Sequence, residues 1–375
     1  MEIKINKESL LEGIGRTQSI VERRATMPIL ANILLEAEEG SLTIKATDLE
    51  VGLAGSYPAQ VIRKGGITVP ARKFYEIIRE LSAEEVHLKS KENNWVEIRS
   101  GAAQFQVVGL DAAEFPALPS FEGASFVPLP ATPLKVMLDT TAFAASTDET
   151  RYHLNGVYWQ IKDKNLLRLV ATDGHRLALT DWKSEEAGKL TPLGRGVILP
   201  RKGISELRRM LEEAGEGSID AAFHKNHALF RTAGGFLMVR LIEGEFPDYE
   251  QVIPRGFNYK ATFSREVMLF ALRRVSLLSV EKGRGVKFSF SAPPKAELEV
   301  WARNPELGEA RESLPVEFEG KGGFSIAFNA RYIMDVLQVL RADKVSLEMA
   351  DELSPGLIRP LSDEKHMSLI MPMRM

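Results

Sequence analysis

The sequence predicts an α+β protein made of three tandem copies of one domain. Two observations carry this prediction. Three motifs recur along the 375 residues at spacings of 125 to 131 positions, and each copy has the same order of strand, helix, strands, helix and strands. Repeats of this length far exceed the roughly 20 to 50 residues of a solenoid unit, so we expect each copy to form its own domain, with helices on one face of an antiparallel sheet.

The first motif is an apolar strand that ends in a short polar turn. Its copies read LTIKATDLEVGL from Leu42, LRLVATDGHRLAL from Leu167 and LEVWARNPELGEA from Leu298. Because Asp and Gly supply turn geometry by themselves, we interpret the recurring strand and turn as scaffold. Only Gly174, His175 and Arg176 are special to the second copy.

The second motif is a strand end that runs into an amphipathic helix. Its copies read VPARKFYEIIREL from Val69, LPRKGISELRRML from Leu199 and FNARYIMDVLQVL from Phe328. Apolar residues recur in them at helical spacing: Phe74, Ile77, Ile78 and Leu81; Ile204, Leu207 and Leu211; Ile333, Val336, Leu337 and Leu340. A further helical pattern opens each copy, namely SLLEGIGRTQSIV, PLKVMLDTTAFAA and REVMLFALRRVSLL.

The third motif is an EFP segment that marks the ends of the first two copies. It reads AEFPALP from Ala113 and GEFPDYE from Gly244. The Pro-rich stretch FPALPSFEGASFVPLP is interpreted as the first linker. These segments predict three domains at residues 1–121, 122–248 and 249–375.

Composition and motifs argue against an enzyme. The chain has no cysteine, which excludes disulfides, thiolate zinc sites and cysteine nucleophiles. It has no phosphate-binding loop, dinucleotide fingerprint, HExxH or GxSxG motif, and its closest histidine pair, His224 and His227, has no third ligand nearby. We therefore expect no catalytic residue, no metal and no cofactor. With no signal-like start and no run of about 18 apolar residues, we expect a cytoplasmic protein with no membrane partner.

Charge is distributed unevenly between helices and strands. The formal net charge is -3. The six predicted helical segments together carry +6, so the strands and loops carry -9. Basic helices and acidic sheets are the asymmetry expected of a protein whose helical face meets a polyanion such as DNA.

The chain resembles the bacterial DNA polymerase III beta subunit family, the processivity sliding clamps, over its whole length. The matching motifs are MPIL from Met27, VPARKF from Val69, RYHLNGV from Arg151, ATDGHRLA from Ala171, PRKG from Pro200, EFPDY from Glu245, FNARYIMDVL from Phe328 and the terminal IMPMRM. The resemblance implies a head-to-tail homodimer that forms a six-domain ring, with helices lining a hole around duplex DNA and antiparallel sheets outside. A separate clamp loader opens the ring, so no ATP site is expected.

The resemblance also implies three sets of site residues. The dimer interface is expected at Phe105 and Val107 of one subunit and Leu277 and Leu278 of the other. DNA contacts are expected at Arg24, Arg72, Lys73, Arg79, Tyr152, His153, Arg201 and Lys202. His153 stands where the family often has a phenol, and Asp148 stands where an amide can sit. We assign no DNA contact to Asp148, because a carboxylate repels phosphate.

The third set is a hydrophobic cleft that binds short peptide motifs of the replicative polymerase, the clamp loader and repair proteins. It maps onto Leu154, Thr172, Gly174, His175, Arg176, Leu177, Pro247, Val252, Asn329, Tyr332, Leu369, Ile370, Met371, Pro372, Met373 and Arg374. Methionines suit an adaptable apolar site, because unbranched thioether side chains repack around different guests.

Two alternatives to a clamp remain open at this stage. One is a monomeric tandem-repeat adaptor that binds proteins without encircling DNA. The other is a hydrolase that uses Asp173, His175 and Arg176, and it requires a carboxylate poised against His175.

Overall fold

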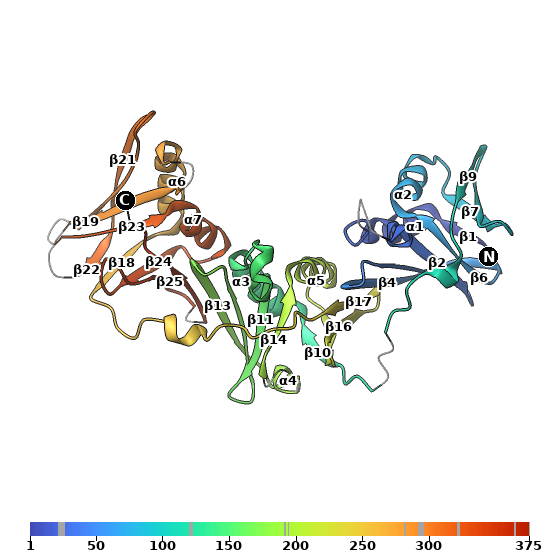
Figure 1. Cartoon of the computed structure of the whole chain (residues 1–375), viewed down its shortest axis with the longest axis horizontal. Coiled ribbons are helices and arrows are strands. Elements are labelled where there is room, and N and C mark those ends of the chain that lie inside the picture. The colour runs from blue at the N-terminus through green and yellow to red at the C-terminus, as the bar shows by residue number, and fades with distance from the viewer. Residues whose placement is uncertain are drawn as a thin grey trace. The chain divides into compact units, whose positions relative to one another are not determined.

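The computed structural model describes residues 1–21, 27–119, 123–190, 193, 195–280, 283–291, 296–320, 323–363 and 365–374, which fall into two compact units (Figure 1). The first unit is Met1–Ala131 with Ser205–Leu241, and the second is Thr132–Ile204 with Ile242–Met375. Each unit combines helices with two sheets, which confirms the α+β prediction. No helix in these described ranges is long and apolar enough to cross a membrane.

The first third of the chain alternates strands with helices as the repeat predicts. Its elements are β1 (Glu2–Asn6), α1 (Lys7–Thr17), η1 (Pro28–Ala31), β2 (Asn32–Glu38), β3 (Ser41–Thr47), β4 (Val51–Pro58), β5 (Gln60–Arg63), β6 (Gly65–Pro70), α2 (Ala71–Glu80), β7 (Glu85–Ser90), β8 (Trp95–Ser100), β9 (Ala103–Val108) and η2 (Ala112–Glu114). Helix α1 begins at Lys7 because the Asn6 side chain accepts hydrogen bonds from the backbone N–H groups of Glu8 and Ser9. Helices α1 and α2 pack side by side in the first unit (Figure 1).

The central third has the same order of main elements. They are β10 (Val127–Pro130), α3 (Ala131–Thr141), η3 (Ala142–Ala144), η4 (Glu149–Leu154), β11 (Gly156–Lys162), β12 (Leu166–Thr172), β13 (Arg176–Lys183), α4 (Glu185–Gly188), β14 (Val197–Pro200), α5 (Arg201–Ala214), β15 (Ser218–His224), β16 (His227–Thr232) and β17 (Gly235–Arg240). The linker interpretation was wrong at the end of the Pro-rich stretch, because β10 pairs with β15. Its prolines are tolerated because β10 is an edge strand.

The last third repeats the order once more. Its elements are η6 (Tyr249–Val252), β18 (Tyr259–Ser264), α6 (Arg265–Val275), η7 (Ser276–Leu278), β19 (Gly285–Phe290), β20 (Glu297–Asn304), β21 (Gly308–Pro315), β22 (Glu317–Glu319), β23 (Phe324–Asn329), α7 (Ala330–Val339), β24 (Lys344–Met349), β25 (Gly356–Pro360) and β26 (His366–Ile370). The apolar positions that helical spacing selects are buried, except for the half-buried Ile77. They form the cores between helices and sheets.

Strand pairing joins the thirds of the chain by one rule. The eight-stranded sheet has the order β10-β15-β16-β17-β4-β3-β2-β6, and the nine-stranded sheet has the order β14-β11-β12-β13-β26-β25-β24-β18-β22. In the first sheet, β17, the final strand of the central third, pairs antiparallel with β4 of the first third. In the second sheet, β26, the final strand of the last third, pairs antiparallel with β13 of the central third. Strands β4 and β13 have the same position in the repeat. The compact units follow these joined sheets, and the domain boundaries near residues 121 and 248 stay a prediction.

Two further sheets end in open edges. Their orders are β5-β1-β7-β8-β9 in the first unit and β21-β20-β19-β23 in the second. By position in the repeat, β9 is equivalent to β17 and β26, and β21 is equivalent to β4 and β13. Their equivalents in the other thirds have a neighbour on both sides. Among the strands that the structure describes, β9 and β21 have a neighbour on one side only.

Candidate functional site

The turn between β12 and β13 is closed by the carboxylate of Asp173. Its Oδ1 accepts hydrogen bonds from the backbone N–H groups of His175 and Arg176 at 2.9 and 3.0 Å. Thr172 Oγ1 donates to the Arg176 carbonyl at 2.6 Å. Gly174 has a φ of +87°, in the left-handed region that glycine adopts most easily. The ATDG segment therefore builds the turn itself.

The equivalent turns confirm that this segment is scaffold. Asp48 Oδ1 accepts from the backbone N–H groups of Glu50 and Val51 at 2.9 and 2.6 Å. Asn304 Oδ1 accepts from those of Glu306 and Leu307 at 2.9 and 3.3 Å. The same side-chain oxygen closes all three turns, so the acidic residue in the second copy has a structural task.

Arg176 connects this turn to the last third of the chain. Its Nε donates to Asp173 Oδ2 at 3.1 Å, its Nη1 to Asp335 Oδ2 at 2.6 Å and its Nη2 to the Phe143 carbonyl at 2.8 Å. The guanidinium also lies over the ring of Tyr332, with 4.6 Å to the centroid. Only 12% of the side chain is exposed. Arg176 is therefore a connector between the turn, η3 and helix α7.

The hydrolase alternative is not supported. The His175 side chain is exposed and makes no hydrogen bond with the residues that the structure describes. Both oxygens of Asp173 are used by the turn and by Arg176. No group of three or more His, Asp or Glu residues within the described ranges could hold a metal ion. The geometry lacks the poised carboxylate that this alternative required.

The C-terminal segment lies directly beside the turn. Strand β26 pairs with β13, which sets Leu369 opposite Leu177 and Ile370 opposite Arg176. Beyond the strand, the Met371 N–H donates to the His175 carbonyl at 2.9 Å and the Met373 N–H donates to the Ala327 carbonyl at 2.8 Å. The structure thus brings together the two segments that were predicted to form the cleft.

The predicted cleft residues differ in exposure. Leu154, Thr172, Leu177, Leu369 and Ile370 are buried, and they support the surface from beneath. Those exposed to solvent are Gly174, His175, Pro247, Val252, Met371 and Arg374. The half-buried ones are Arg176, Asn329, Tyr332, Pro372 and Met373. Asn329 is largely structural, since its side chain caps helix α7 by accepting from the Arg331 N–H at 2.9 Å.

A groove of about 1090 Å³ runs beside the tail, and we call it the tail groove. One side is lined by tail residues 371–374. The rest of the lining includes residues that sequence reasoning missed, chiefly Lys287, Trp301, Arg303 and Leu353. Alternation along β19 and β20 marks Lys287 and Trp301 as outward-facing, but their position opposite each other depends on a strand register that sequence alone does not give.

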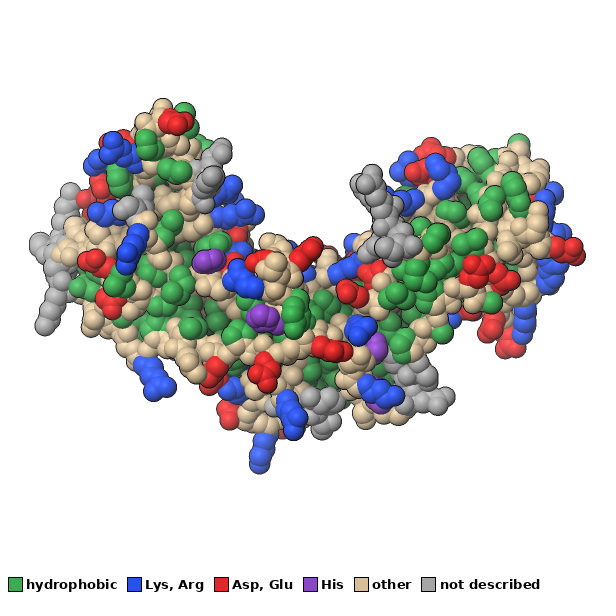
Figure 2. All heavy atoms as spheres, in the orientation of Figure 1, with side chains coloured by type: hydrophobic (Ala, Val, Ile, Leu, Met, Phe, Trp, Pro, Cys, Tyr) green, Lys and Arg blue, Asp and Glu red, His purple; other side chains and the backbone are tan. Residues whose placement is uncertain are grey.

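The residues predicted to contact DNA lie mostly on helix surfaces. Arg72, Lys73 and Arg79 are exposed on α2, where Figure 2 shows basic and acidic side chains lying together. Lys73 pairs with Glu76, and Arg79 Nε pairs with Glu80 at 3.0 Å. Arg24 lies outside the described residues.

The central third supplies the remaining predicted DNA contacts. Tyr152 is 56% exposed and stands edge-on to His153, with 5.7 Å between ring centroids. Arg201 is exposed and Lys202 is half-buried at the start of α5. Hydrogen bonds from Thr150 and Arg151 hold the pKa of the Asp148 carboxyl below its usual value.

The residues predicted for the dimer interface lie at the two open edges. Phe105, on edge strand β9, is 39% exposed, and Val107 on the same strand is half-buried. Leu277 is 77% exposed in η7, which packs against β20 and β21, and Leu278 beside it is half-buried. Exposed apolar side chains on an open sheet edge are unusual unless another chain covers them.

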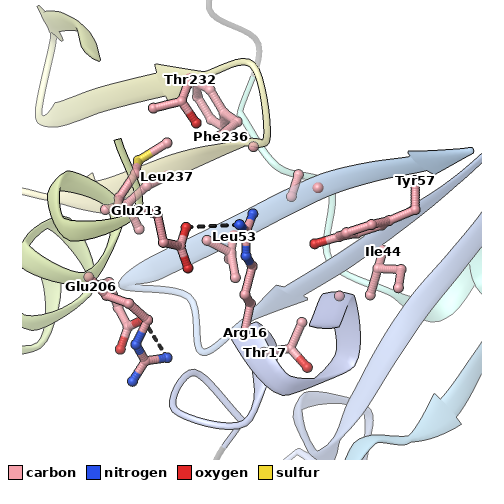
Figure 3. Close-up of a pocket in the computed structure, with 16 residues that line it drawn as sticks. Arg16, Thr17, Ile44, Leu53, Tyr57, Glu206, Glu213, Thr232, Phe236 and Leu237 are labelled. Carbon is pink, nitrogen blue, oxygen red and sulfur yellow. Dashed lines mark ion pairs between the residues drawn. The ribbon is translucent and has the colours of Figure 1, made fainter. Parts of the chain in front are cut away.

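A small cavity in the first unit surrounds Arg16 at the end of α1 (Figure 3). Arg16 Nη2 pairs with Glu213 of α5 at 2.9 Å, and Nη1 donates to the Gly234 carbonyl at 3.0 Å. The cavity volume of about 30 Å³ is large enough to hold a water molecule. Arg16 thus joins the first third to the central third, as Arg176 joins the central third to the last.

Comparisons with known proteins cover the whole chain. Family models match in three parts: "DNA polymerase III beta subunit, N-terminal domain" over residues 1–119, its "central domain" over 128–248 and its "C-terminal domain" over 250–374. The "Beta sliding clamp" of Caulobacter vibrioides is 38% identical over 379 residues, and that of Pseudomonas putida is 34% identical over 379 residues, with 100% of both chains covered in each case.

Solved structures agree with these matches. The C. crescentus beta sliding clamp "with PEG bound to putative beta-motif tethering region" has a TM-score of 0.93 and 38% identity. A sliding clamp from Pseudomonas aeruginosa "bound to griselimycin" has a TM-score of 0.91 and 33% identity. Both cover 100% of each chain.

Proposed function

The chain belongs to the DNA polymerase III beta subunit family, the beta sliding clamps, and we propose that two copies close head to tail into a ring that encircles duplex DNA. As a sliding clamp it serves DNA replication by keeping a polymerase on its template. In this proposal the protein is a non-catalytic subunit, because topological linkage rather than chemistry provides processivity.

The rule of sheet joining carries the ring proposal. Twice within the chain, the final strand of one third pairs antiparallel with a strand of the preceding third: β17 with β4, and β26 with β13. Within the described residues, β9 and β21 each pair with a strand on one side only. A second copy of the chain satisfies both, since its β21 can pair with β9 and its β9 with β21. A closed dimer then has no unsatisfied edge of this kind.

The internal junction also gives a register for this pairing. The hairpins β8–β9 and β16–β17 have loops of equal length, which makes Phe105 equivalent to Leu237. Leu237 lies opposite Leu53 in β4, and Leu53 lies opposite Ala46 in β3.

The repeat carries this register to the last third. The motifs LTIKAT and LEVWAR align Ala46 with Ala302, whose partner on β21 is Ala310. We therefore place Phe105 opposite the partner's Ala310, and Gln104 opposite the partner's Arg311.

Exposed apolar side chains support a dimer interface at the same two edges. Phe105 and Leu277 are both uncovered in the single chain. Burying apolar surface contributes about 25 cal/mol per Å². Two interfaces per ring would therefore hold the dimer through Phe105, Val107, Leu277 and Leu278.

Basic helix surfaces support the DNA partner. Arg72, Lys73, Arg79, Arg201 and Lys202, with Arg24, are proposed to meet phosphate, and Tyr152 and His153 are proposed to meet DNA at the start of the central third. Lys73 and Arg79 already have carboxylate partners, so their pull on phosphate is weak. Weak, sequence-independent contacts suit sliding, because retention comes from encirclement.

The surface formed by the turn and the tail is proposed as the cleft for partner proteins. His175, Pro247, Val252 and Met371 expose mixed apolar surface around buried Leu177 and Leu369. We propose that the clamp loader, the replicative polymerase and repair proteins bind here through short apolar peptides. The PEG and griselimycin complexes of the related clamps support a ligand-binding surface in the family.

Localisation and domain limits complete the proposal. A clamp acts on DNA, so we place the protein in the cytoplasm, where bacterial DNA lies. We propose three clamp domains with boundaries near residues 121 and 248, where the EFP segments end.

The ring is tested by mass and by DNA topology. At micromolar protein concentration, light scattering should give a molecular mass of about twice the 41.7 kDa of one chain. After loading, the protein should remain on nicked circular duplex and slide off the same duplex once it is linearised. A monomer that binds partner peptides would instead establish the adaptor alternative.

A further inference from the structure

The tail groove lies on the outward face of the sheet β21-β20-β19-β23. Strand register sets Ala327, Lys287 and Trp301 in one row across this face, and the backbone of Met373 is bonded to Ala327 at the edge of the row. The groove therefore runs from the tail across small residues to Lys287 and Trp301. It starts at the tail residues of the cleft and extends away from the turn at residues 172–176.

The charge of this groove is positive. Three cations line it, Lys287, Arg303 and Arg374, against one carboxylate, Glu352. None of the three cations forms an ion pair with the part of the chain that the structure describes. This differs from α2, where Lys73 and Arg79 are paired. Unpaired cations in a concave site attract carboxylates more strongly than the same groups on an open surface.

Trp301 is held in place beside these cations. Its Nε1 donates to Glu309 Oε2 at 3.3 Å, and Arg311 lies 5.8 Å from the ring centroid. Its cross-strand neighbour on the other side is Lys287. A fixed indole between two cations provides a flat apolar wall along which an extended peptide can lie. The carboxylates of that peptide can then face the basic groups.

Exposed apolar side chains also line the groove. Leu353 is 72% exposed, Val280 is 47% exposed and Met371 is 42% exposed, and all three line it. Apolar surface next to a row of cations matches a peptide better than a nucleic acid.

We propose that the tail groove binds an acidic segment of a partner protein, contiguous with the short apolar motif that occupies the cleft. This inference rests on the proposed function of the cleft. The apolar motif lets every partner bind the cleft. In some partners, carboxylates next to that motif contact Lys287 and Arg303, and this contact raises the affinity of those partners over the others. Partners with acidic flanks should therefore displace partners with neutral flanks.

The test uses the full-length dimer and fluorescence anisotropy of labelled peptides. One peptide carries an apolar motif alone. Four others add Asp-Glu-Asp-Glu or Gly-Ser-Gly-Ser at its N-terminal or C-terminal end. On the wild type, one acidic extension should tighten binding about tenfold over its neutral match at low salt, and this gain should shrink at high salt because the contacts are ionic.

The double variant Lys287→Glu/Arg303→Glu should remove that gain and leave the affinity for the motif alone unchanged. The matched control is Arg341→Glu/Lys365→Glu, which changes the net charge equally at exposed positions outside the groove. It should keep most of the gain. Unchanged binding of the motif alone also shows that both variants are folded.

Each other outcome overturns a specific statement. If the motif binds but neither acidic extension adds affinity, or if the gain survives charge reversal in the groove, the groove proposal is wrong and the cleft stands. If no peptide binds the wild type, both fail. If an oligo-dT strand competes with the acidic extension and loses affinity in the double variant, the groove binds single-stranded DNA instead of an acidic peptide.

Discussion

Arg176 Nη1 lies 2.6 Å from Asp335 Oδ2, which ties the β12–β13 turn of the central third to helix α7 of the last third. These residues are 159 positions apart in the chain. Because the pair is mostly shielded from water and the guanidinium has two further hydrogen bonds, it holds the floor of the cleft. The arginine that looks catalytic in the sequence is a structural connector.

Replacing Arg176 with Ala should destabilise the protein by about 3 kcal/mol, because the change leaves Asp173, Asp335 and the Phe143 carbonyl without their shared donor. Urea unfolding followed by tryptophan fluorescence measures this loss. Arg72→Ala is the control, since Arg72 is exposed on α2 and should change stability by less than about 0.5 kcal/mol. Equal stability of the two variants would contradict the connector role.

Local patterns in the sequence were sufficient for the repeat and its turns. The oxygens of Asp48, Asp173 and Asn304 bond to backbone groups two and three residues ahead, so short motifs encode those turns. Helix positions such as Phe74 were predictable because helical spacing is also local. The partner of Arg176 was not predictable, because Asp335 is brought to it only by the pairing of β13 with β26.

The tail groove escaped prediction for the same reason. Lys287 and Trp301 are 14 positions apart, and each looks like an ordinary outward-facing residue on its own strand. Their placement in one row depends on the register of β19 with β20, and Leu353 comes from a third element, the loop before β25. Sites assembled from several strands depend on tertiary pairing, which hydrophobic periodicity does not encode.

Disulfide trapping should detect the pairing of β9 with the partner's β21. The chain has no cysteine, so Gln104→Cys combined with Arg311→Cys introduces the only thiols. Directly opposite residues have Cα atoms about 4.5 to 5.5 Å apart, which suits a disulfide. Oxidation should therefore give a covalent dimer on a non-reducing gel, and the dimer should revert to monomer with a thiol reductant.

The control for this register is Gln104→Cys combined with Ser313→Cys. Ser313 lies two positions beyond Arg311 along β21, about 6.6 to 6.8 Å from it. A thiol at position 313 is therefore beyond easy reach of the thiol at position 104. A higher yield from Ser313→Cys would show a register shifted by two residues, and no dimer from either variant would refute the pairing of these strands.

Lowering the pH should weaken the junction of β13 and β26 through His366. Its Nδ1 lies 2.9 Å from Thr180 Oγ1 and its Nε2 lies 3.0 Å from Ser368 Oγ. Burial lowers the pKa of His366 from 6.5 to about 4. Below pH 6.5 the unfolded chain binds a proton at this site that the folded chain does not bind. Stability should therefore fall as the pH drops from about 6.5 to about 4, by up to about 3 kcal/mol.

The measurement for His366 is the difference in unfolding free energy between the wild type and His366→Gln across this pH range. Subtracting the two curves removes the titration of the other histidines, including His227, whose pKa is also lowered by burial. The two curves should converge at low pH. Parallel curves would show that His366 does not titrate differently on folding, and an NMR midpoint near 6.5 for its ring would show the same.

Removing the tail should abolish partner binding without opening the ring. Deleting residues 371–375 removes the exposed Met371 and one wall of the cleft, but leaves β26 intact with Leu369 and Ile370 buried in their cores. Peptide titration by fluorescence anisotropy should lose its signal, while light scattering should still give a dimer, because β9, β21 and Leu277 are untouched. His175→Ala should weaken the peptide by only about 1 kcal/mol, since the exposed ring serves as a wall. Unchanged affinity after the deletion would refute the cleft, and loss of the dimer would place the tail in the ring contact.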